Sequence, residues 1–188
     1  MTTDTDDMVQ RDYKAKPATS RHGTHALITV AYDVVSVPEE EPVVLVLKAF
    51  EPEKPGRWGL PGGSWGRYPE ETPFDTVRRL VEARLGIVAP ISPVVLGVDW
   101  TPQARFAPGM NYIFDGGVLP AASAEQIRPV PGGGYADVRI LPPSRFSEID
   151  IDHAAAARIS LALAQRRSRA GVLMTMRGEL ISIPASRA

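Results

Sequence analysis

The order of hydrophobic and polar positions predicts a series of strands interrupted by two helices. Runs of β-branched and other apolar residues cover residues 24–35 and 42–50, and the polar stretch SVPEEE between them predicts a hairpin connection. Three more runs of the same character predict further strands, at residues 92–100, 110–119 and 135–141. Residues 1–22 are polar and charged, with too few apolar side chains to offset the entropy of ordering. We therefore expect a flexible N-terminal tail over residues 1–22 and a single domain over residues 23–188.

One predicted helix has clear signals at both ends. Thr72 can cap its N-terminus, Pro73 suits the first helical position, and Asp75 can close a capping box. Gly86 suits the left-handed conformation in which helices commonly end. These residues predict a helix that begins after Thr72 and ends at Gly86.

The C-terminal part of the chain predicts a second helix and a hairpin. Residues 152–167 have the apolar spacing of an amphipathic helix, and residues 172–183 predict two short strands with Arg177 and Gly178 at the turn. The order strand, strand, helix, strands, helix is typical of an α/β protein in which a mixed sheet lies between helices.

Composition and charge narrow the classes of function. Hydrophobic residues make up 44% and charged residues 23% of the 188 positions, which is close to an average soluble protein. The net charge of -1 gives no electrostatic basis for binding nucleic acid or an anionic membrane, so we expect neither as a partner. The absence of cysteine excludes disulfides, thiolate nucleophiles and sulfur-ligated zinc. With no leader-like N-terminus and no apolar stretch of membrane-spanning length, a cytoplasmic protein is expected.

The stretch WGLPGG at residues 58–63 and the helix that follows it carry a specific spacing. Glu71 is followed by seven residues and then by Arg79, and the later positions are Val81, Gly86 and Ile87. On these residues the chain resembles the Nudix hydrolases. Their signature is a Gly, five residues, Glu, seven residues and then Arg-Glu-U-x-Glu-Glu-x-Gly-U, where U is a bulky aliphatic residue. This sequence has two extra residues before Glu71, and its flanking strands and C-terminal helix extend the resemblance to roughly residues 24–170.

The resemblance implies a Nudix-type α/β/α sandwich with a mixed β-sheet. It also implies hydrolysis of a nucleoside diphosphate linked to another group, assisted by Mg²⁺ or Mn²⁺, because such hard cations prefer carboxylate oxygens. A small-molecule substrate or ligand is the partner that it implies, with a homodimer as one option for the assembly.

The three glutamates that follow the arginine in the family signature are absent from this sequence. Their positions hold Leu80, Ala83 and Arg84, which still share one face of a helix at about 100° per residue. Glu82, the nearest acid, points roughly the opposite way. Metal assistance is worth several kcal/mol of transition-state stabilisation, so its loss would slow hydrolysis by several orders of magnitude.

Two arrangements could compensate for the missing carboxylates. In a second register, counted from Glu70, Glu82 would take a metal position, but the helix would need a bulge. Alternatively, carboxylates from elsewhere could enter the cleft, namely those of Glu70, Glu71, Asp115 or Asp137. The candidate catalytic residues are accordingly Glu70, Glu71, Arg79 and Glu82, and the metal ligands remain unassigned.

Candidate ligand-binding residues lie in the glycine-rich stretch that starts with WGLPGG and precedes the predicted helix (the glycine loop), on the helix itself and on a later strand. They are Gly62, Gly63, Trp65, Tyr68, Arg84, Asn111 and Tyr112. Trp65 and Tyr68 either stack on a planar ligand group or anchor the loop to the core. Arg84 either replaces the charge of the metal at a phosphate or carboxylate, or merely covers the cleft. His22 and His25 lie at the start of a strand without a third ligand, so no metal is assigned to them.

Two classes of function are consistent with these residues. The first is a divergent hydrolase with a reorganised or metal-poor centre that processes a nucleoside-diphosphate-linked or other phosphorylated molecule. The second is a non-hydrolytic protein of the same fold, either a ligand-binding module or a biosynthetic enzyme that uses the pocket for other chemistry. The Pro-Gly-Gly loop and the helix frame favour a retained pocket in both cases.

Overall fold

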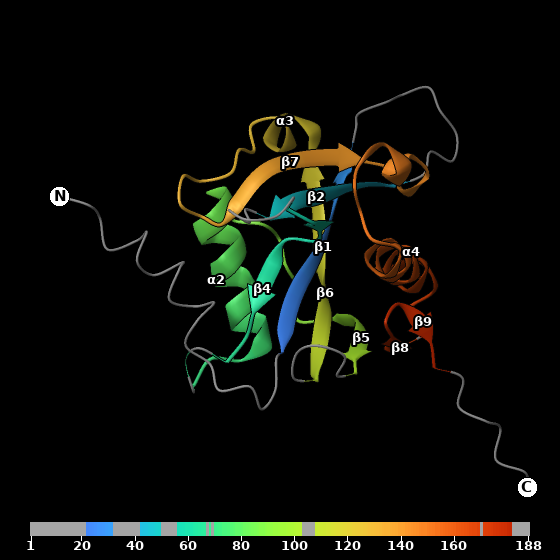
Figure 1. Ribbon diagram of the computed structural model, residues 1–188. Coiled ribbons are helices and arrows are strands. Elements are labelled where there is room, and N and C mark those ends of the chain that lie inside the picture. The colour runs from blue at the N-terminus through green and yellow to red at the C-terminus, as the bar shows by residue number, and fades with distance from the viewer. Residues whose placement is uncertain are drawn as a thin grey trace, which may run out of the picture.

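The computed structural model describes residues 22–31, 42–49, 56–66, 68, 70–102, 108–169 and 171–181. A mixed β-sheet lies between two helices, α2 on one side and α4 on the other (Figure 1). The strands are β1 (Gly23–Ala31), β2 (Val43–Ala49), β3 (Trp58–Gly59), β4 (Gly62–Ser64), β5 (Val95–Thr101), β6 (Gly109–Pro120), β7 (Tyr135–Leu141), β8 (Leu173–Met176) and β9 (Glu179–Leu180). The helices are α2 (Pro73–Leu85), α3 (Ala121–Ala124), α4 (His153–Ser168) and a 3₁₀ helix, η1 (Pro143–Glu148). This is the predicted α/β/α sandwich with a mixed sheet.

Strand β1 organises the sheet. It runs antiparallel to β2 and β4 and parallel to β6. β6 pairs with β5 in antiparallel orientation, and β5 runs parallel to β8, which forms a hairpin with β9. β3 and β7 both pair with β2 in antiparallel orientation. The predicted pairing of the first two strands is confirmed, with Thr29 opposite Val44, and their connection lies outside the described residues.

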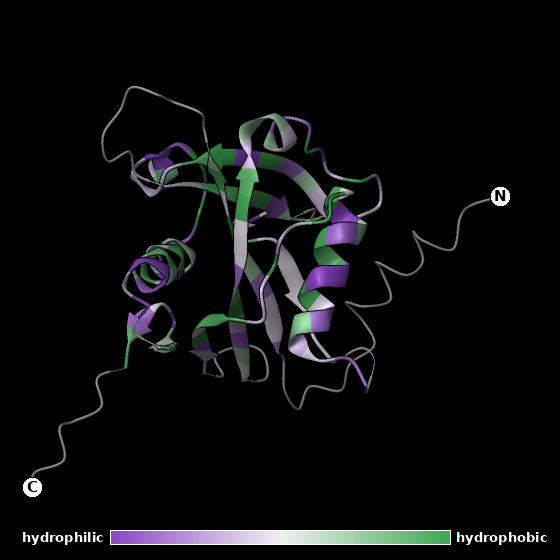
Figure 2. Ribbon diagram, turned by 180° about the vertical axis from the view of Figure 1, so that it is seen from behind, coloured by the Kyte–Doolittle hydropathy of each residue, from purple (hydrophilic) through white to green (hydrophobic). Residues whose placement is uncertain are grey.

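Helix α2 begins and ends at the residues that the sequence predicts. The Thr72 side chain accepts a hydrogen bond from the Asp75 N–H, and the Asp75 carboxylate accepts one from the Thr72 N–H in return, which completes the capping box. Pro73 occupies the first turn, and Gly86 closes the helix with φ of +65°. Hydrophilic and hydrophobic segments alternate along α2, as expected for a helix with one buried side (Figure 2).

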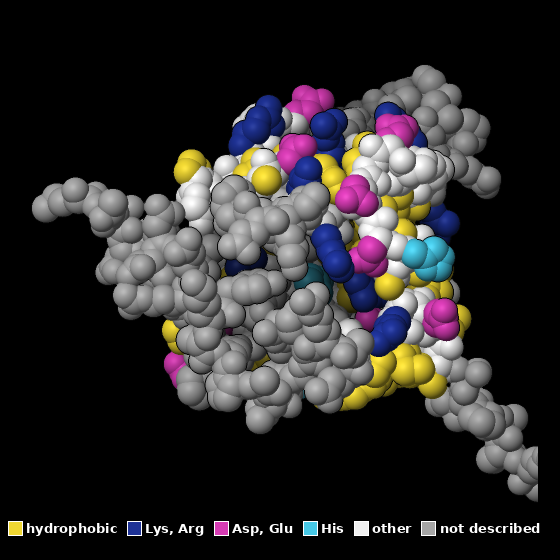
Figure 3. Space-filling model, in the orientation of Figure 1, with side chains coloured by type: hydrophobic (Ala, Val, Ile, Leu, Met, Phe, Trp, Pro, Cys, Tyr) yellow, Lys and Arg dark blue, Asp and Glu magenta, His cyan; other side chains and the backbone are white. Residues whose placement is uncertain are grey.

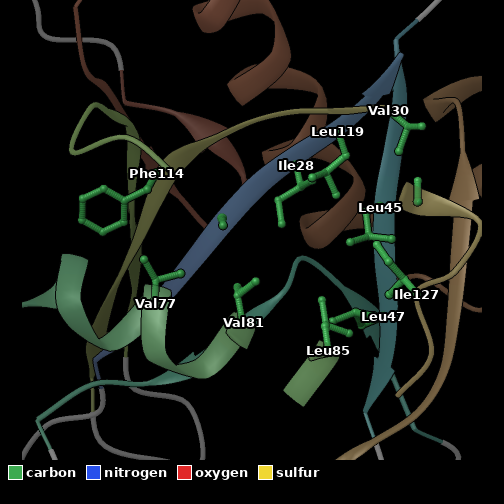
Figure 4. Packing of buried hydrophobic residues seen from close by; sticks show 12 residues of the cluster. Ile28, Val30, Leu45, Leu47, Val77, Val81, Leu85, Phe114, Leu119 and Ile127 are labelled. Atoms are coloured by element: carbon green, nitrogen blue, oxygen red, sulfur yellow. The ribbon is translucent and has the colours of Figure 1, made fainter. Parts of the chain in front are cut away.

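Two hydrophobic cores hold the sandwich together. Between the sheet and α2, Val77, Val81 and Leu85 of the helix pack towards Ile28 of β1 and Phe114 of β6 (Figure 4). The other face of the sheet packs against α4 and η1 through a second cluster, formed by Leu27, Val44, Val46, Trp58, Leu96, Ile113, Leu141, Phe146, Ile159, Ala162 and Leu163. Alternate residues of each central strand serve opposite cores, because successive side chains of a strand point to opposite faces.

Some elements were not predicted. The glycine-rich stretch before α2 contains the short strands β3 and β4, and both α3 and η1 are additional. The strands at 92–100, 110–119 and 135–141, the C-terminal helix and the hairpin with Arg177 and Gly178 at its turn are all present, with ends shifted by a few residues. The tail expected over residues 1–22 lies outside the described residues except for His22.

Candidate functional site

The glycine loop that carries β4 lies directly against the start of β1. The two strands pair with His25 opposite Gly62 and Thr24 opposite Gly63. Gly62 has φ of +147°, and a Cβ there would overlap the carbonyl oxygen of Thr24 and lie 2.7 Å from Cα of His25. The loop can approach β1 this closely because Gly62 has no side chain.

On the α2 side, Arg84 holds the glycine loop. Its Nη1 donates a hydrogen bond to the carbonyl oxygen of Gly62 at 2.7 Å, and its guanidinium carbon lies 5.3 Å from the centre of the Tyr135 ring. The Tyr135 hydroxyl donates to the same carbonyl oxygen at 2.6 Å and accepts from the Gly62 N–H at 3.0 Å. A Cβ on Gly63 would lie 2.9 Å from Arg84 and 3.1 Å from Leu80. The helix face at the loop therefore presents one cationic and one apolar side chain.

Glu71, where the loop meets α2, is bound by other side chains. Arg79 donates to both of its carboxylate oxygens, at 2.6 and 2.9 Å, and the Thr76 hydroxyl donates to one of them at 2.8 Å. The hydrogen bonds from Arg79 lower the pKa of Glu71 below 4.5, an effect that partial burial opposes and the Thr76 bond reinforces. Glu71 is therefore ionised at neutral pH and joins the loop to the helix.

A cavity of about 220 Å³ lies on the other side of the glycine loop, between the sheet and α4. Its wall is formed by His25, Arg57, Trp58, Gly59, Leu60, Asn111, Ile113, Asp152, Ala155, Arg158 and Ile159. An apolar wall with a few convergent polar groups is typical of small-molecule sites. Such sites usually measure roughly 300–1,000 Å³ for a drug-sized molecule, so this cavity would enclose part of one.

His25 lies on the cavity wall and next to the glycine loop. Its Nδ1 is buried and has no hydrogen-bond partner among the described residues. Its pKa is lowered from 6.5 to about 4, first by burial and then by the positive charges of Arg158 and Arg84, while interactions with the Leu60 backbone and the Asn111 side chain oppose this shift. His25 is therefore neutral at pH 7, and arginines on both sides of the glycine loop act on it.

Comparison with known proteins adds the identity of the fold. No protein-family model and no curated protein matches the chain. Among solved structures, a MutT protein from Methanosarcina mazei Go1 aligns at a TM-score of 0.59 and 18% identity, over 83% of this chain and 99% of that one. A mutT/nudix family protein from Listeria innocua aligns at 0.62 and 17%, over 81% and 98%. The NUDIX domain of Shewanella oneidensis NrtR, solved with ADP ribose, aligns at 0.58 and 20%, over 89% and 99%.

The chain has the Nudix fold. At identities of 20% or less, these similarities establish the architecture and leave the chemistry to be argued from the residues.

Helix α2 carries no carboxylate at the three positions where the sequence resemblance implies metal-binding glutamates. At these positions Leu80 is buried, Ala83 is exposed and Arg84 binds the loop carbonyl. Within the described ranges, no group of three or more His, Asp or Glu side chains could hold a metal ion. The second register also fails, because α2 is a regular α-helix from Pro73 to Leu85 without the bulge that it requires, and Glu82 is exposed.

The other predicted carboxylates lie in separate places. Glu70 is exposed in the turn before α2. Asp115 forms an ion pair with Arg166 at 3.2 Å, and the half-exposed Asp137 forms one with Arg139 at 3.4 Å. Neither aspartate contributes to the cavity wall.

The two aromatic residues of the loop contact the protein itself. The Trp65 indole N–H donates to the Glu71 carbonyl oxygen at 2.7 Å, and its ring lies edge-on to Tyr112 at 6.1 Å. Tyr68 lies under the guanidinium of Arg79, at 5.1 Å from the ring centre. These contacts agree with the interpretation in which both residues anchor the loop.

Asn111 and Tyr112, both predicted from the sequence to contact a ligand, point to opposite faces of the sheet. Asn111 lies on the cavity wall, whereas Tyr112 packs against the core beneath α2. The alternation of side chains along β6 separates them.

Sequence reasoning assigned no role to three charged residues of the cavity wall. They are Arg57 in the segment before β3, Asp152 at the N-cap of α4 and Arg158 within α4. Asp99 of β5, behind the wall, was also missed, although a charged residue at an inward position of an apolar strand signals a buried partner.

On the described part of the face shown in Figure 3, basic and acidic side chains are interspersed. In the part of the chain that the structure describes, no helix has both the length and the apolar character needed to cross a membrane.

Proposed function

We propose that this Nudix-fold protein binds a phosphorylated small molecule of the nucleoside-diphosphate class in the cavity, with arginines supplying the positive charge that a metal ion supplies in a hydrolase. The observation that carries this proposal is the placement of Arg57 and Arg158 on the wall of one cavity, beside a neutral His25 on which Arg84 also acts. Guanidinium groups match phosphate geometry with paired N–H donors and keep their charge at every physiological pH.

The remaining polar residues suit the nucleoside part of such a ligand. The carboxylate of Asp152 and the amide of Asn111 can accept hydrogen bonds from hydroxyl or amino groups. Trp58, Leu60 and Ile159 supply apolar wall against which a base or sugar can pack. The NUDIX domain of Shewanella oneidensis NrtR was solved with ADP ribose, which makes ADP-ribose a suitable first probe.

The residues of helix α2 support ligand binding without metal-dependent hydrolysis. A cation held by α2 would need carboxylates where Leu80, Ala83 and Arg84 stand, and Arg84 already binds the loop. The proposal also retains a single domain over residues 23–188, a cytoplasmic location and a homodimer, the last of which light scattering would test.

The test is isothermal titration of the full chain with ADP-ribose, AMP and adenosine, each with Mg²⁺ and with EDTA, alongside an assay of phosphate and nucleotide release. ADP-ribose should bind more tightly than adenosine and equally well in EDTA, without turnover. Arg57→Ala should weaken ADP-ribose binding by about tenfold or more, because a charge-assisted hydrogen bond contributes about 1.5–3 kcal/mol. Arg139→Ala, an exposed arginine outside the cavity wall, serves as the matched control and should bind as the wild type does.

Two results would contradict the proposal. Turnover at ordinary enzymatic rates that disappears in EDTA would mean that a metal centre assembles from other residues. Equal affinity for ADP-ribose and adenosine would mean that the arginines do not recognise phosphate.

A further inference from the structure

A buried carboxylate behind the cavity joins three segments that are distant in sequence. The side chain of Asp99, on β5, is 0% exposed. One of its oxygens accepts hydrogen bonds from the Thr175 hydroxyl at 2.6 Å and from the Gly178 N–H at 2.9 Å. The other accepts from Nη1 of Arg158, on α4, at 2.8 Å. The Asp99 carboxylate therefore joins the sheet, the C-terminal hairpin β8–β9 and helix α4.

The hairpin reaches Asp99 because of two local features. Strand β8 runs parallel to β5 with Thr175 opposite Asp99, which brings the hydroxyl to the carboxylate. The turn then lies against the first turn of α4: Gly178 has φ of +82°, and a Cβ there would lie 2.6 Å from the carbonyl oxygen of Ala154. A residue with a side chain would move the turn and its N–H away from Asp99.

The bond to Asp99 holds the Arg158 side chain in place and leaves part of it accessible at the cavity. Its side chain is 25% exposed and forms part of the cavity wall. The bond to Asp99 uses one of the five N–H donors of the guanidinium, within the described contacts of this residue. A long side chain without this anchor would lose conformational entropy on meeting a ligand, at about 0.5–1.5 kcal/mol per immobilised side chain.

We propose that Asp99, supported by Thr175 and Gly178 of the hairpin β8–β9, is a positioning residue that holds the Arg158 guanidinium at the cavity wall to receive a phosphate group. This proposal rests on the proposed function and assigns the C-terminal hairpin a part in ligand recognition. It predicts that the loss of Asp99 weakens the recognition of phosphate more than the recognition of the uncharged part of the ligand.

The binding test is a double-mutant cycle with Asp99→Asn, Arg158→Ala and their combination, titrated with ADP-ribose and with adenosine. Asp99→Asn should weaken ADP-ribose binding by about three- to tenfold, the equivalent of one side chain left to be ordered, and change adenosine binding less than twofold. In the Arg158→Ala background it should have no further effect. Asp137→Asn, at an exposed ion pair, is the matched control and should bind as the wild type does.

A purely structural role for Asp99 gives a different pattern. Asp99→Asn would then weaken both ligands equally, or its effect would add to that of Arg158→Ala, and either result would overturn the proposal. Thr175→Val removes one bond to the carboxylate and keeps the charge, so it provides a milder variant if Asp99→Asn does not fold. It should weaken ADP-ribose selectively as well, by less than Asp99→Asn does.

A second measurement needs no ligand. Phenylglyoxal modifies free guanidinium groups, and peptide mass spectrometry gives the rate at each arginine. Arg158 should react several times faster in Asp99→Asn or Thr175→Val than in the wild type, while Arg139 reacts at the same rate in all three. If the wild type binds no phosphorylated probe, the proposed function fails while this rate still tests the positioning. An unchanged rate at Arg158 would overturn the positioning itself.

Discussion

Replacing His25 by glutamine should remove a defined part of the destabilisation of this protein in acid. The pKa of His25 is lowered from 6.5 to about 4 by burial and by Arg158 and Arg84. Since the folded state binds this proton more weakly than the unfolded state, protonation between pH 6.5 and pH 4 favours unfolding. Stability therefore falls as the pH is lowered through this window. With these two values, His25 accounts for about 2.5 kcal/mol of lost stability between pH 7 and pH 4.5.

Urea denaturation of both proteins at several pH values between 7 and 4.5 measures this difference. The free energy of unfolding of the wild type should fall by about 2.5 kcal/mol more than that of His25→Gln over this range. Carboxylates with lowered pKa values, such as that of Glu71, also lose their stabilising effect in acid, but both proteins contain them and their contribution cancels. His153→Gln, at an exposed histidine on the first residue of α4, should keep the wild-type dependence on pH.

Parallel pH profiles for the wild type and His25→Gln would refute the argument that His25 is held neutral in the folded protein. An NMR titration of the His25 imidazole in the folded protein gives the second check, since a midpoint near 6.5 would contradict the combined effect of burial and the arginines. If an anionic ligand occupies the cavity, the same midpoint should move upward on binding, because the ligand charge offsets that of the arginines.

Other substitutions separate the contacts of the loop and the helix. Gly62→Ala should lower the free energy of unfolding in urea by about 3 kcal/mol, because its Cβ meets backbone at a positive φ, whereas Gly63→Ala, which meets only side-chain atoms, should cost less than half as much. Glu71→Gln should lower the free energy of unfolding in urea by about 1 kcal/mol at pH 7, and the difference should shrink as the pH falls. Glu148→Gln, at an exposed ion pair, should leave the free energy of unfolding unchanged. Thr72→Ala should lower the free energy of unfolding by about 1 kcal/mol, because the helix loses its N-cap, and thermal unfolding would detect this change.

The helix α2 shows what local sequence can predict. Its capping box, its proline and its terminal glycine all act within a few residues, so the ends of the helix could be assigned before the structure was known. The short strands β3 and β4 could not, because they exist only through pairing with β2 and β1. Within two or three residues, a strand has no periodicity of its own to detect.

The candidate site was predictable in part. The Pro-Gly-Gly loop and the lack of a carboxylate at positions 80, 83 and 84 could be read from spacing along one helix and its preceding loop, whereas the contact of Arg84 with that loop came from the structure. The cavity on the other face of the sheet did not follow from spacing. Arg57 and Arg158 lie about a hundred positions apart and share a wall only after α4 packs on the sheet.

The sequence by itself determined the order of the main strands and helices, the limits of α2 and the identity of the residues at positions 80, 83 and 84, where the resemblance implies glutamates, because each depends on neighbours in the chain or on residue identity. The tertiary structure decided which side of the sheet Asn111 and Tyr112 face, why His25 is neutral, and how Asp99 holds Arg158 through the C-terminal hairpin. Those properties depend on burial and on charges brought together from distant segments. Electrostatic and packing energies of that kind are set by distance in space, which local residue patterns do not encode.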